Sequence, residues 1–268
     1  MLDHLMKIIK KASDAILAEY HKDVPSDIDW KADDSPLTAA DQASHEIIKE
    51  ELAKAFPDIP LMSEEGSETP YEERRHWSRF WCVDPVDGTK EFIKKTGQFT
   101  VNIALIENEE PVIGLIYVPA QQLLYYAEKG KGAFKVEEDN FDAPKQIYAD
   151  HQYTNESGLT IVASRDHAGP TVKKLFEEYP KASTSSMGSS LKFCLIAEGK
   201  ADLYYRDVPT FEWDTAAAQC IVETAGGYVL TETGQRLTYN KENLLNPYLI
   251  TIARNGKSWV KVIQRLKG

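Results

Sequence analysis

Closely spaced apolar runs between residues 98 and 134 constrain the fold of this chain more than any other feature. QFTVNIALIENEEPVIGLIYVPA (98–120) contains two β-rich runs joined by a polar turn, which predicts a hairpin. LLYYAEKGKGAF (123–134) follows at once and predicts a third strand with a glycine-rich bend. Strands joined so closely favour a sheet of hairpins, and such a sheet needs a further layer over its apolar face.

Helical patterns surround these predicted strands. Apolar residues recur at helical spacing over 2–16, which predicts an amphipathic helix at the start of the chain. A second helix is expected to begin near Thr38, and short strands are expected at 59–66 and 80–84. Beyond the polar stretch 139–158, elements are expected to alternate, with strands at 159–164, 201–205, 227–230 and 249–253, and helices near 168–178, 188–199, 214–225 and 256–267.

The pattern therefore changes near 139–158, the only stretch that has the composition of an internal boundary. Strands before it are mainly hairpin-linked, whereas those after it alternate with helices. We predict an α+β layered fold, in which residues 1–268 form a single domain with two subdomain-like halves, about 1–157 and 158–268.

The net charge of −11 narrows the choice of binding partners. Proteins that bind nucleic-acid polymers usually carry basic surfaces, so this charge argues against such a partner. It does not argue against a small anionic substrate, because bound metal ions reverse the local sign of the charge.

Cysteine usage and the apolar runs indicate the compartment. Cys82, Cys194 and Cys220 are far apart and form no CxxC pair, which favours buried thiols in a reducing compartment over disulfides or zinc. The N-terminal segment lacks the apolar core of a signal peptide, and no run approaches the roughly 20 apolar residues of a membrane span. We expect a cytoplasmic protein without a transmembrane segment.

WCVDPVDGTKEF (81–92) carries the strongest chemical signal in the chain. An apolar strand runs directly into Asp84 and Asp87, and Gly88 permits a tight backbone turn after them. A helix that begins at Thr89 would leave its first N–H groups without intrahelical partners. Two carboxylates beside free backbone donors favour a metal ion that holds a phosphate group.

Other acidic residues stand where predicted strands or helices begin or end, in LTAAD (37–41), MSEE (62–65) and WDTAAA (213–218). Taken singly, each has a simple structural explanation. Asp41 follows Thr38 at capping-box spacing, and Asp214 suits the positive end of a helix dipole. Glu64 and Glu65 begin an acidic run of the kind that is usually solvated.

Taken together, these acids indicate a metal centre. Carboxylates without clustered His or Cys favour Mg²⁺ or Mn²⁺ over zinc. The carbonyl of Val86, between the two aspartates, is a further candidate ligand. Two neighbouring classes do not fit: phosphatases with an aspartate nucleophile carry DxDGT, with one residue fewer between the aspartates, and an EF-hand needs a closing Glu that is absent at its spacing.

DPVDGT, the upstream SEE and the downstream WDTAAAQCIVETAGG together resemble the inositol monophosphatase superfamily of metal-dependent, lithium-sensitive phosphatases. DPVDGTKEF and SSLKFCLIAEGKADLYYR are similar to the bacterial CysQ-type branch, the 3'(2'),5'-bisphosphate nucleotidases. The resemblance extends over nearly the whole chain. It implies a layered αβαβα sandwich, with the metal site in the first half and substrate selection in the second.

The resemblance also implies residue roles at the matching positions. The metal ligands would be Glu64, Asp84, the Val86 carbonyl, Asp87 and Asp214, with Glu65 as the second choice for the first position. Thr89 would orient the attacking water with Glu64 and Asp41 in support, and the Gly88 and Thr89 amides would hold the phosphate. One metal would acidify the water and another would neutralise the leaving oxygen, without a covalent enzyme intermediate.

Substrate contacts implied by the branch lie in both halves. The implied set is Glu64, Val86, Asp87, Gly88, Thr89, His167, Ser189, Lys192, Arg206 and Asp214. Lys192 and Arg206 would bind the second phosphate of a nucleotide, although without the resemblance they read as a solvated helix residue and a strand-end charge.

The expected reaction is release of the 3'-phosphate of adenosine 3',5'-bisphosphate, and of its sulfated precursor, to leave AMP in the first case. Within the same fold the alternatives are an inositol-1-phosphatase, against which the KEF ending of the motif counts, and a sugar bisphosphatase. A non-catalytic metal or nucleotide sensor is an alternative from a different class. Such proteins usually lose acids from the site, whereas every expected acid is present here.

Overall fold

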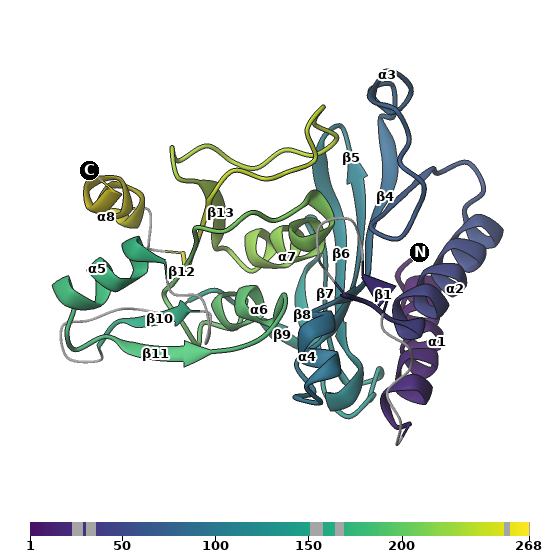
Figure 1. The fold of residues 1–268 in the computed structure, drawn as a ribbon, viewed down its shortest axis with the longest axis horizontal. Helices are drawn as coiled ribbons and strands as arrows, with labels where there is room; N and C mark the ends of the chain where they lie inside the picture. The colour runs from purple at the N-terminus through teal and green to yellow at the C-terminus, as the bar shows by residue number, and fades with distance from the viewer. Residues whose placement is uncertain (23–28, 31–35, 151–157, 164–168, 255–257, 268) are drawn as a thin grey trace.

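The computed structural model describes residues 1–22, 29–30, 36–150, 158–163, 169–254 and 258–267. Its elements stack as helices, sheet, helices, sheet and helices (Figure 1). This arrangement confirms the predicted α+β layered sandwich of αβαβα type. The physical reason is that each sheet has two apolar faces, and every face is covered by a helical layer.

The first layer consists of α1 (Leu2–Tyr20) and α2 (Ala39–Ala55), which cover one face of the larger sheet (Figure 1). Ile9 of α1 and Ile48 of α2 are buried in one apolar cluster with Trp81 of that sheet. Both helices were predicted from the sequence, and α2 begins after Thr38 as expected. Helical spacing of apolar residues thus identified the buried faces correctly.

The larger sheet has the strand order β3-β4-β5-β6-β7-β8-β9. Its strands are β3 (Leu61–Ser63), β4 (Arg79–Asp87), β5 (Thr100–Glu107), β6 (Glu110–Val118), β7 (Leu123–Glu128), β8 (Gly132–Val136) and β9 (Lys145–Ile147). β3 pairs with β4 in parallel, and all other neighbours are antiparallel. The hairpin predicted at 98–120 is confirmed.

The single strand predicted at 123–134 is wrong, because this stretch forms two strands joined by a tight turn. Gly130 has φ +82° and Gly132 has φ +111°, backbone conformations that favour glycine. The expected glycine-rich bend is therefore a complete reversal of the chain. β9 was not predicted, since its three residues lie in the polar stretch 139–158, which has the composition of an internal boundary.

The central layer contains α6 (Leu191–Ala197) and α7 (Glu212–Thr224), packed between the two sheets (Figure 1). Its apolar cluster includes Ala104 of the larger sheet, Ala217 of α7 and Leu249 of the smaller sheet. Gly114 of β6 allows α7 to approach closely, because a Cβ there would lie 2.5 Å from the carbonyl oxygen of Ala217.

Replacing Gly114 by Ala is expected to destabilise the protein by about 1–3 kcal/mol, because the added methyl group overpacks this contact. The measurement is the urea midpoint at unchanged m-value. An unfolding midpoint equal to that of the unmodified protein would show that α7 moves away from β6 at no cost.

The smaller sheet has the order β11-β10-β12-β14-β13, with helices α5 (Pro170–Glu178) and α8 (Ser258–Lys267) on its outer face (Figure 1). Its strands are β10 (Thr160–Ala163), β11 (Ser183–Ser186), β12 (Leu203–Arg206), β13 (Tyr228–Thr231) and β14 (Leu249–Ile252). Each was predicted except β11, whose sequence STSS carries no apolar signal. β11 forms because it pairs with β10 at the sheet edge.

Short elements complete the described structure: β1 (Asp29–Trp30), β2 (Pro36–Leu37), α3 (Tyr71–Arg74), α4 (Thr89–Ile93) and a 3₁₀ turn (Pro119–Gln121). Only α4 was predicted. Among the described residues, no helix combines the length and the apolar character needed to cross a membrane. All strands of the larger sheet precede residue 157 and all strands of the smaller sheet follow it. The division into halves at this point stays a prediction, since α6 and α7 pack between both sheets.

Candidate metal centre

The DPVDGT motif lies where β4 ends and α4 begins. β4 extends to Asp87, beyond the predicted end at Asp84, and its register with β5 shifts between these two residues. Such an irregularity re-aims side chains at the end of a strand. Val86 N donates to Asp84 Oδ1 at 3.1 Å, which fixes this carboxylate at the turn. Gly88 then adopts φ +92° before the helix, the conformation for which the sequence predicted a glycine.

Three of the predicted acids meet at this point. Glu64 follows β3, Asp84 lies on β4 and Asp214 lies in the first turn of α7, and one oxygen of each lies within 4.8 Å of the others. Burial raises the pKa of Asp84 well above its usual value, and the charges of Glu64 and Asp87 raise it further. Burial also raises the pKa of Asp214, followed by the charges of Asp87 and Glu64.

This donor set fits a hard divalent cation. The group contains carboxylates only, and crowded carboxylates repel one another unless a proton or a cation lies between them. A divalent ion relieves that repulsion and accepts oxygen ligands of this kind. The structure therefore contains an acidic cluster suited to metal binding, assembled from three separate segments of the chain.

Asp87 does not join the group of three oxygens, although its charge acts on both Asp84 and Asp214. Its Oδ2 accepts hydrogen bonds from Ser189 Oγ at 2.6 Å and from Ser190 N at 2.7 Å and Oγ at 2.6 Å. Every hydrogen bond described for Asp87 ends on Oδ2. The other carboxylate oxygen, Oδ1, is therefore the atom with which Asp87 could ligate a metal.

Asp41 and Asp214 each have a structural role and a position at the site. Asp41 Oδ2 accepts from Thr38 N at 2.8 Å, as the capping-box spacing predicted, and Asp41 Oδ1 accepts from Thr89 Oγ1 at 3.2 Å. Asp214 Oδ2 accepts from Phe211 N at 2.8 Å at the start of α7. The structural explanation and the functional one are thus compatible, because a carboxylate has two oxygens.

The residues before α6 hold Asp87 in place. Ser189 has φ +52°, a backbone conformation that is uncommon for residues other than glycine. Its Oγ also contacts Thr100 Oγ1 at 2.6 Å. Lys192 is only 6% exposed, and its Nζ donates to the carbonyls of Ser189 at 2.9 Å and Met187 at 3.2 Å. Burial lowers the pKa of Lys192 to about 8. In this structure Lys192 therefore fastens the loop that presents Ser189.

Sequence reasoning missed several polar residues that support the motif. Ser190 Oγ donates a hydrogen bond to Asp87 beside that of Ser189, and Asn102 Nδ2 donates to Ser190 Oγ at 2.8 Å. Ser44 of α2 donates to the Pro85 carbonyl at 2.9 Å, which ties the motif to the first helical layer. Ser190 lies in a stretch already singled out, but nothing in the local sequence distinguishes Asn102 or Ser44.

Arg206 lies at the end of β12, half-buried, and its Nε donates no hydrogen bond to any described residue. The guanidinium group interacts with the Tyr204 side chain and with the charges of Asp214 and Asp87. His167, which was predicted to contact the nucleotide, lies outside the described residues. Glu65 is half-buried beside Glu64 and is not part of the group of three oxygens.

A cavity of about 320 Å³ adjoins the cluster and includes Glu64 in its lining. Phe211 and Trp213 stack in its wall with ring centroids 4.9 Å apart and an interplanar angle of 13°.

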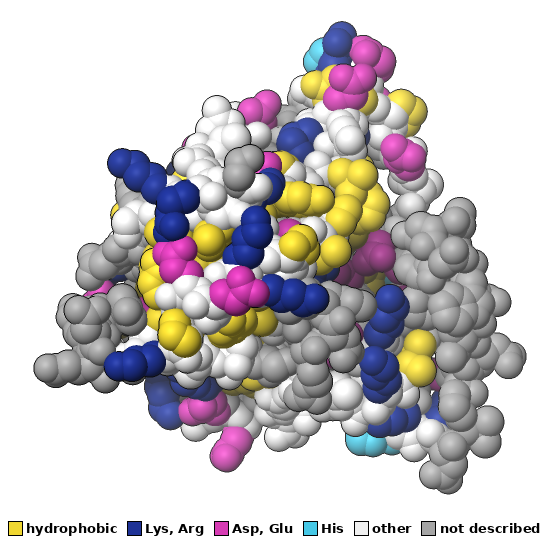
Figure 2. All heavy atoms as spheres, turned by 60° about the vertical axis from the view of Figure 1, so that its left-hand side comes forward, with side chains coloured by type: hydrophobic (Ala, Val, Ile, Leu, Met, Phe, Trp, Pro, Cys, Tyr) yellow, Lys and Arg dark blue, Asp and Glu magenta, His cyan; other side chains and the backbone are white. Residues whose placement is uncertain are grey.

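On the face of the protein shown in Figure 2, Lys and Arg side chains are mixed with Asp and Glu side chains, and apolar groups lie between them. The described residues of this face thus form no continuous basic stripe.

Comparison with known proteins agrees with this geometry. The profile of the inositol monophosphatase family matches residues 1–259, and the chain belongs to this family. It is 44% identical over 248 residues to the 3'(2'),5'-bisphosphate nucleotidase CysQ of Escherichia coli K12, covering 92% of this chain and 97% of the relative. It is 45% identical over 254 residues to the CysQ nucleotidase of Salmonella typhimurium, covering 94% and 100%.

Solved structures show the same fold. The crystal structure of CysQ from Bacteroides thetaiotaomicron, a bacterial member of the inositol monophosphatase family, is 40% identical with a TM-score of 0.79 and covers 94% of this chain and 96% of that one. The extragenic suppressor protein SuhB from Bartonella henselae, at 24% identity and a TM-score of 0.80, covers 99% and 98% and shares the fold.

Proposed function

We propose that this chain is a metal-dependent 3'(2'),5'-bisphosphate nucleotidase. Its substrate is adenosine 3',5'-bisphosphate, which it converts to AMP and phosphate, and 3'-phosphoadenosine 5'-phosphosulfate is a second substrate. The observation that carries the proposal is the meeting of Glu64, Asp84 and Asp214 within 4.8 Å. The relatives named CysQ support the choice of substrate, because they are 44–45% identical over almost the whole chain.

The metals are Mg²⁺ ions, with Mn²⁺ as a substitute. Their ligands are the carboxylates of Glu64, Asp84, Asp87 and Asp214 and the carbonyl of Val86. When bound, such ions neutralise charge on the phosphate and make a water molecule more acidic. Asp87 contributes through Oδ1, since its Oδ2 is occupied by hydrogen bonds from the loop before α6.

Thr89 orients the attacking water. Its hydroxyl donates to Asp41 Oδ1 at 3.2 Å and lies 3.4 Å from the Val86 carbonyl oxygen, so the lone pairs of the hydroxyl oxygen remain available to accept a hydrogen bond from the water. Asp41 and Glu64 support this arrangement. The amides of Gly88 and Thr89 hold the phosphate, because the first N–H groups of a helix lack intrahelical partners.

Arg206 binds the second phosphate of the substrate through its guanidinium group, which is half-buried at the end of β12. Ser189, whose Oγ donates to Asp87, supplies a hydroxyl to the substrate, and His167 completes the set. The sequence predicted the same role for Lys192. We now assign Lys192 to support of the Ser189 loop, because its ammonium group is buried on two backbone carbonyls.

The alternatives differ in substrate. An inositol-1-phosphatase or a sugar bisphosphatase would use the same metal chemistry, and a non-catalytic sensor would bind metal without turnover. A phosphate-release assay with adenosine 3',5'-bisphosphate, inositol 1-phosphate and fructose 1,6-bisphosphate separates them. Preference for inositol phosphate or for the sugar would refute the nucleotidase proposal, and no release from any ester would favour the sensor.

Removal of divalent metal is expected to abolish turnover, because the three clustered carboxylates would repel the phosphate without a cation between them. Activity should return on addition of Mg²⁺ or Mn²⁺, and lithium should inhibit it, as the family resemblance implies. The measurement is phosphate release after dialysis against EDTA. Full turnover in excess chelator would refute the metal mechanism.

A further inference from the structure

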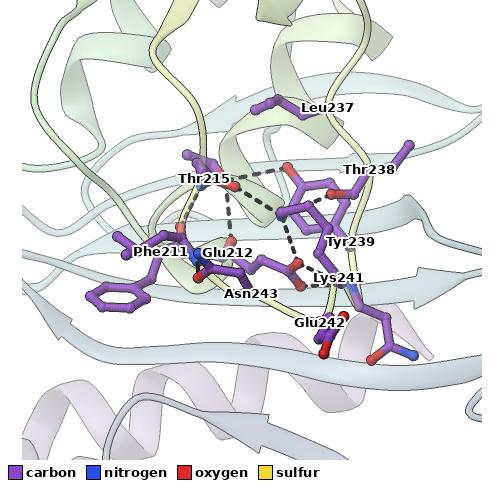
Figure 3. Close-up of polar contacts among 12 residues, drawn as sticks. Phe211, Glu212, Thr215, Leu237, Thr238, Tyr239, Lys241, Glu242 and Asn243 are labelled. Carbon is purple, nitrogen blue, oxygen red and sulfur yellow. Dashed lines mark hydrogen bonds and ion pairs between the residues drawn. The ribbon is translucent and has the colours of Figure 1, made fainter. Parts of the chain in front are cut away.

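Glu212 is a fully buried carboxylate in the first turn of α7, two residues before Asp214. Its Oε2 accepts from Asn240 N at 2.7 Å, and its Oε1 accepts from Lys241 N at 2.9 Å and from Lys241 Nζ at 2.6 Å (Figure 3). The carboxylate is thus satisfied entirely by a segment about 28 residues further along the chain.

That segment, residues 239–246, is also fastened from other directions. Arg74 of α3 donates to Asn240 Oδ1 at 3.0 Å and to the carbonyls of Lys241 at 2.7 Å and Glu242 at 2.9 Å. Asn246 Nδ2 donates to the Phe211 carbonyl at 2.7 Å, directly before α7. Residues 239–246 therefore connect α3 to the start of α7. Glu212 is the charged residue through which α7 contacts this segment.

The start of α7 does not need Glu212 as a cap, because Asp214 already accepts the Phe211 N–H at 2.8 Å. A buried carboxylate is costly unless it is fully paired, so its presence here calls for another reason. Asp214 shares the first helical turn with Glu212, and one of its oxygens is committed to the cap. The orientation of that turn therefore sets where the other oxygen of Asp214 points.

We propose that Glu212 is a positioning residue for the metal centre. By binding Lys241 and the backbone of residues 240–241, it fixes the first turn of α7 so that Asp214 stays within reach of Glu64 and Asp84. It thereby sets the affinity of the site for divalent cations. The inference rests on the metal centre of the proposed function, but not on which phosphate ester is the substrate.

The test is direct binding of Mn²⁺, counted from the free-ion electron paramagnetic resonance signal without any substrate. Glu212→Gln keeps the shape of the side chain and removes the charge that holds Lys241. The dissociation constant should rise about ten- to a hundredfold, the usual effect of losing a partner that orients a metal ligand. The Mg²⁺ concentration for half-maximal activity should rise in parallel, while kcat at saturating Mg²⁺ stays near that of the unmodified protein.

Glu198→Gln is the matched control. Glu198 is also a buried carboxylate, with its side chain 8% exposed and its Oε2 3.2 Å from Lys135 Nζ, at the opposite end of α6 from Ser189. It should lose stability to a similar extent without any change in Mn²⁺ affinity. If Glu212→Gln does not fold, Lys241→Met tests the same contact while the backbone N–H groups still satisfy Glu212.

An unchanged Mn²⁺ dissociation constant in a folded Glu212→Gln or Lys241→Met protein would overturn the inference. An equal loss of affinity in Glu198→Gln would overturn it as well, because the effect would then follow from reduced stability alone. Since no substrate is present, neither result depends on whether the protein proves to be a nucleotidase.

Discussion

Asp214→Asn is expected to lower kcat/KM for adenosine 3',5'-bisphosphate by at least about a hundredfold, the scale of several kcal/mol that a metal-centred charge contributes. Asparagine keeps an oxygen that can accept the Phe211 N–H, so the start of α7 should survive. What is lost is the charge shared with Glu64 and Asp84. Asp87→Asn should have an effect of the same size, since Asp87 acts on the same cluster.

Asp202→Asn is the control for these substitutions. Asp202 is 3% exposed and accepts the Thr160 N–H at 2.8 Å, where β10 and β12 begin in the smaller sheet rather than at the acidic cluster. It should cost stability but leave kcat/KM within a few fold. The measurements are steady-state kinetics and thermal unfolding of each variant. Near-normal activity of a folded Asp214→Asn or Asp87→Asn protein would show that the ligand assignment is wrong.

Arg206→Ala is expected to weaken use of adenosine 3',5'-bisphosphate by about ten- to more than a hundredfold, because a charge-assisted hydrogen bond contributes roughly 1.5–3 kcal/mol. Hydrolysis of adenosine 3'-phosphate or inositol 1-phosphate, which lack the second phosphate, should change little. The ratio of kcat/KM for the bisphosphate and the monophosphate, before and after substitution, is the measurement. It separates loss of a substrate contact from general damage to the site.

Lys192→Ala provides the comparison. If Lys192 supports the loop through the carbonyls of Met187 and Ser189, its loss should lower activity on both substrates by a similar factor. A fall in activity on the bisphosphate alone would instead support the direct phosphate contact that the sequence predicted for Lys192. Equal falls on both substrates in Arg206→Ala would refute the assignment of Arg206 to the second phosphate.

Most of the architecture could be predicted from the sequence because its signals are local. Apolar spacing identified α1 and α2, and alternating strands and helices identified the smaller sheet apart from β11. β11 was missed because a polar edge strand forms through pairing with β10 rather than through its own propensity. The turn between β7 and β8 was underestimated because composition marks glycines but not how far they reverse the chain.

The sequence alone identified the three acids that the structure brings together, Glu64, Asp84 and Asp214. DPVDGT places two carboxylates and a glycine turn within six residues, and that spacing is legible without any tertiary information. The motif stretches also carried the family resemblance, and the family itself is confirmed by the match over residues 1–259. Each acid could be named from its own segment because ligand type depends on side-chain chemistry.

Only the tertiary structure decided how those residues are shared between roles. Asp41 and Asp214 each divide two oxygens between a helix start and the site, and Lys192 turns inward to carbonyls that lie next to it in sequence. Glu212 is held by residues 239–246, which connect α3 to the start of α7. The contacts of Glu212 and Arg74 depend on which segments meet in the folded chain, and local sequence cannot specify them because the partners lie from 28 to 168 residues apart.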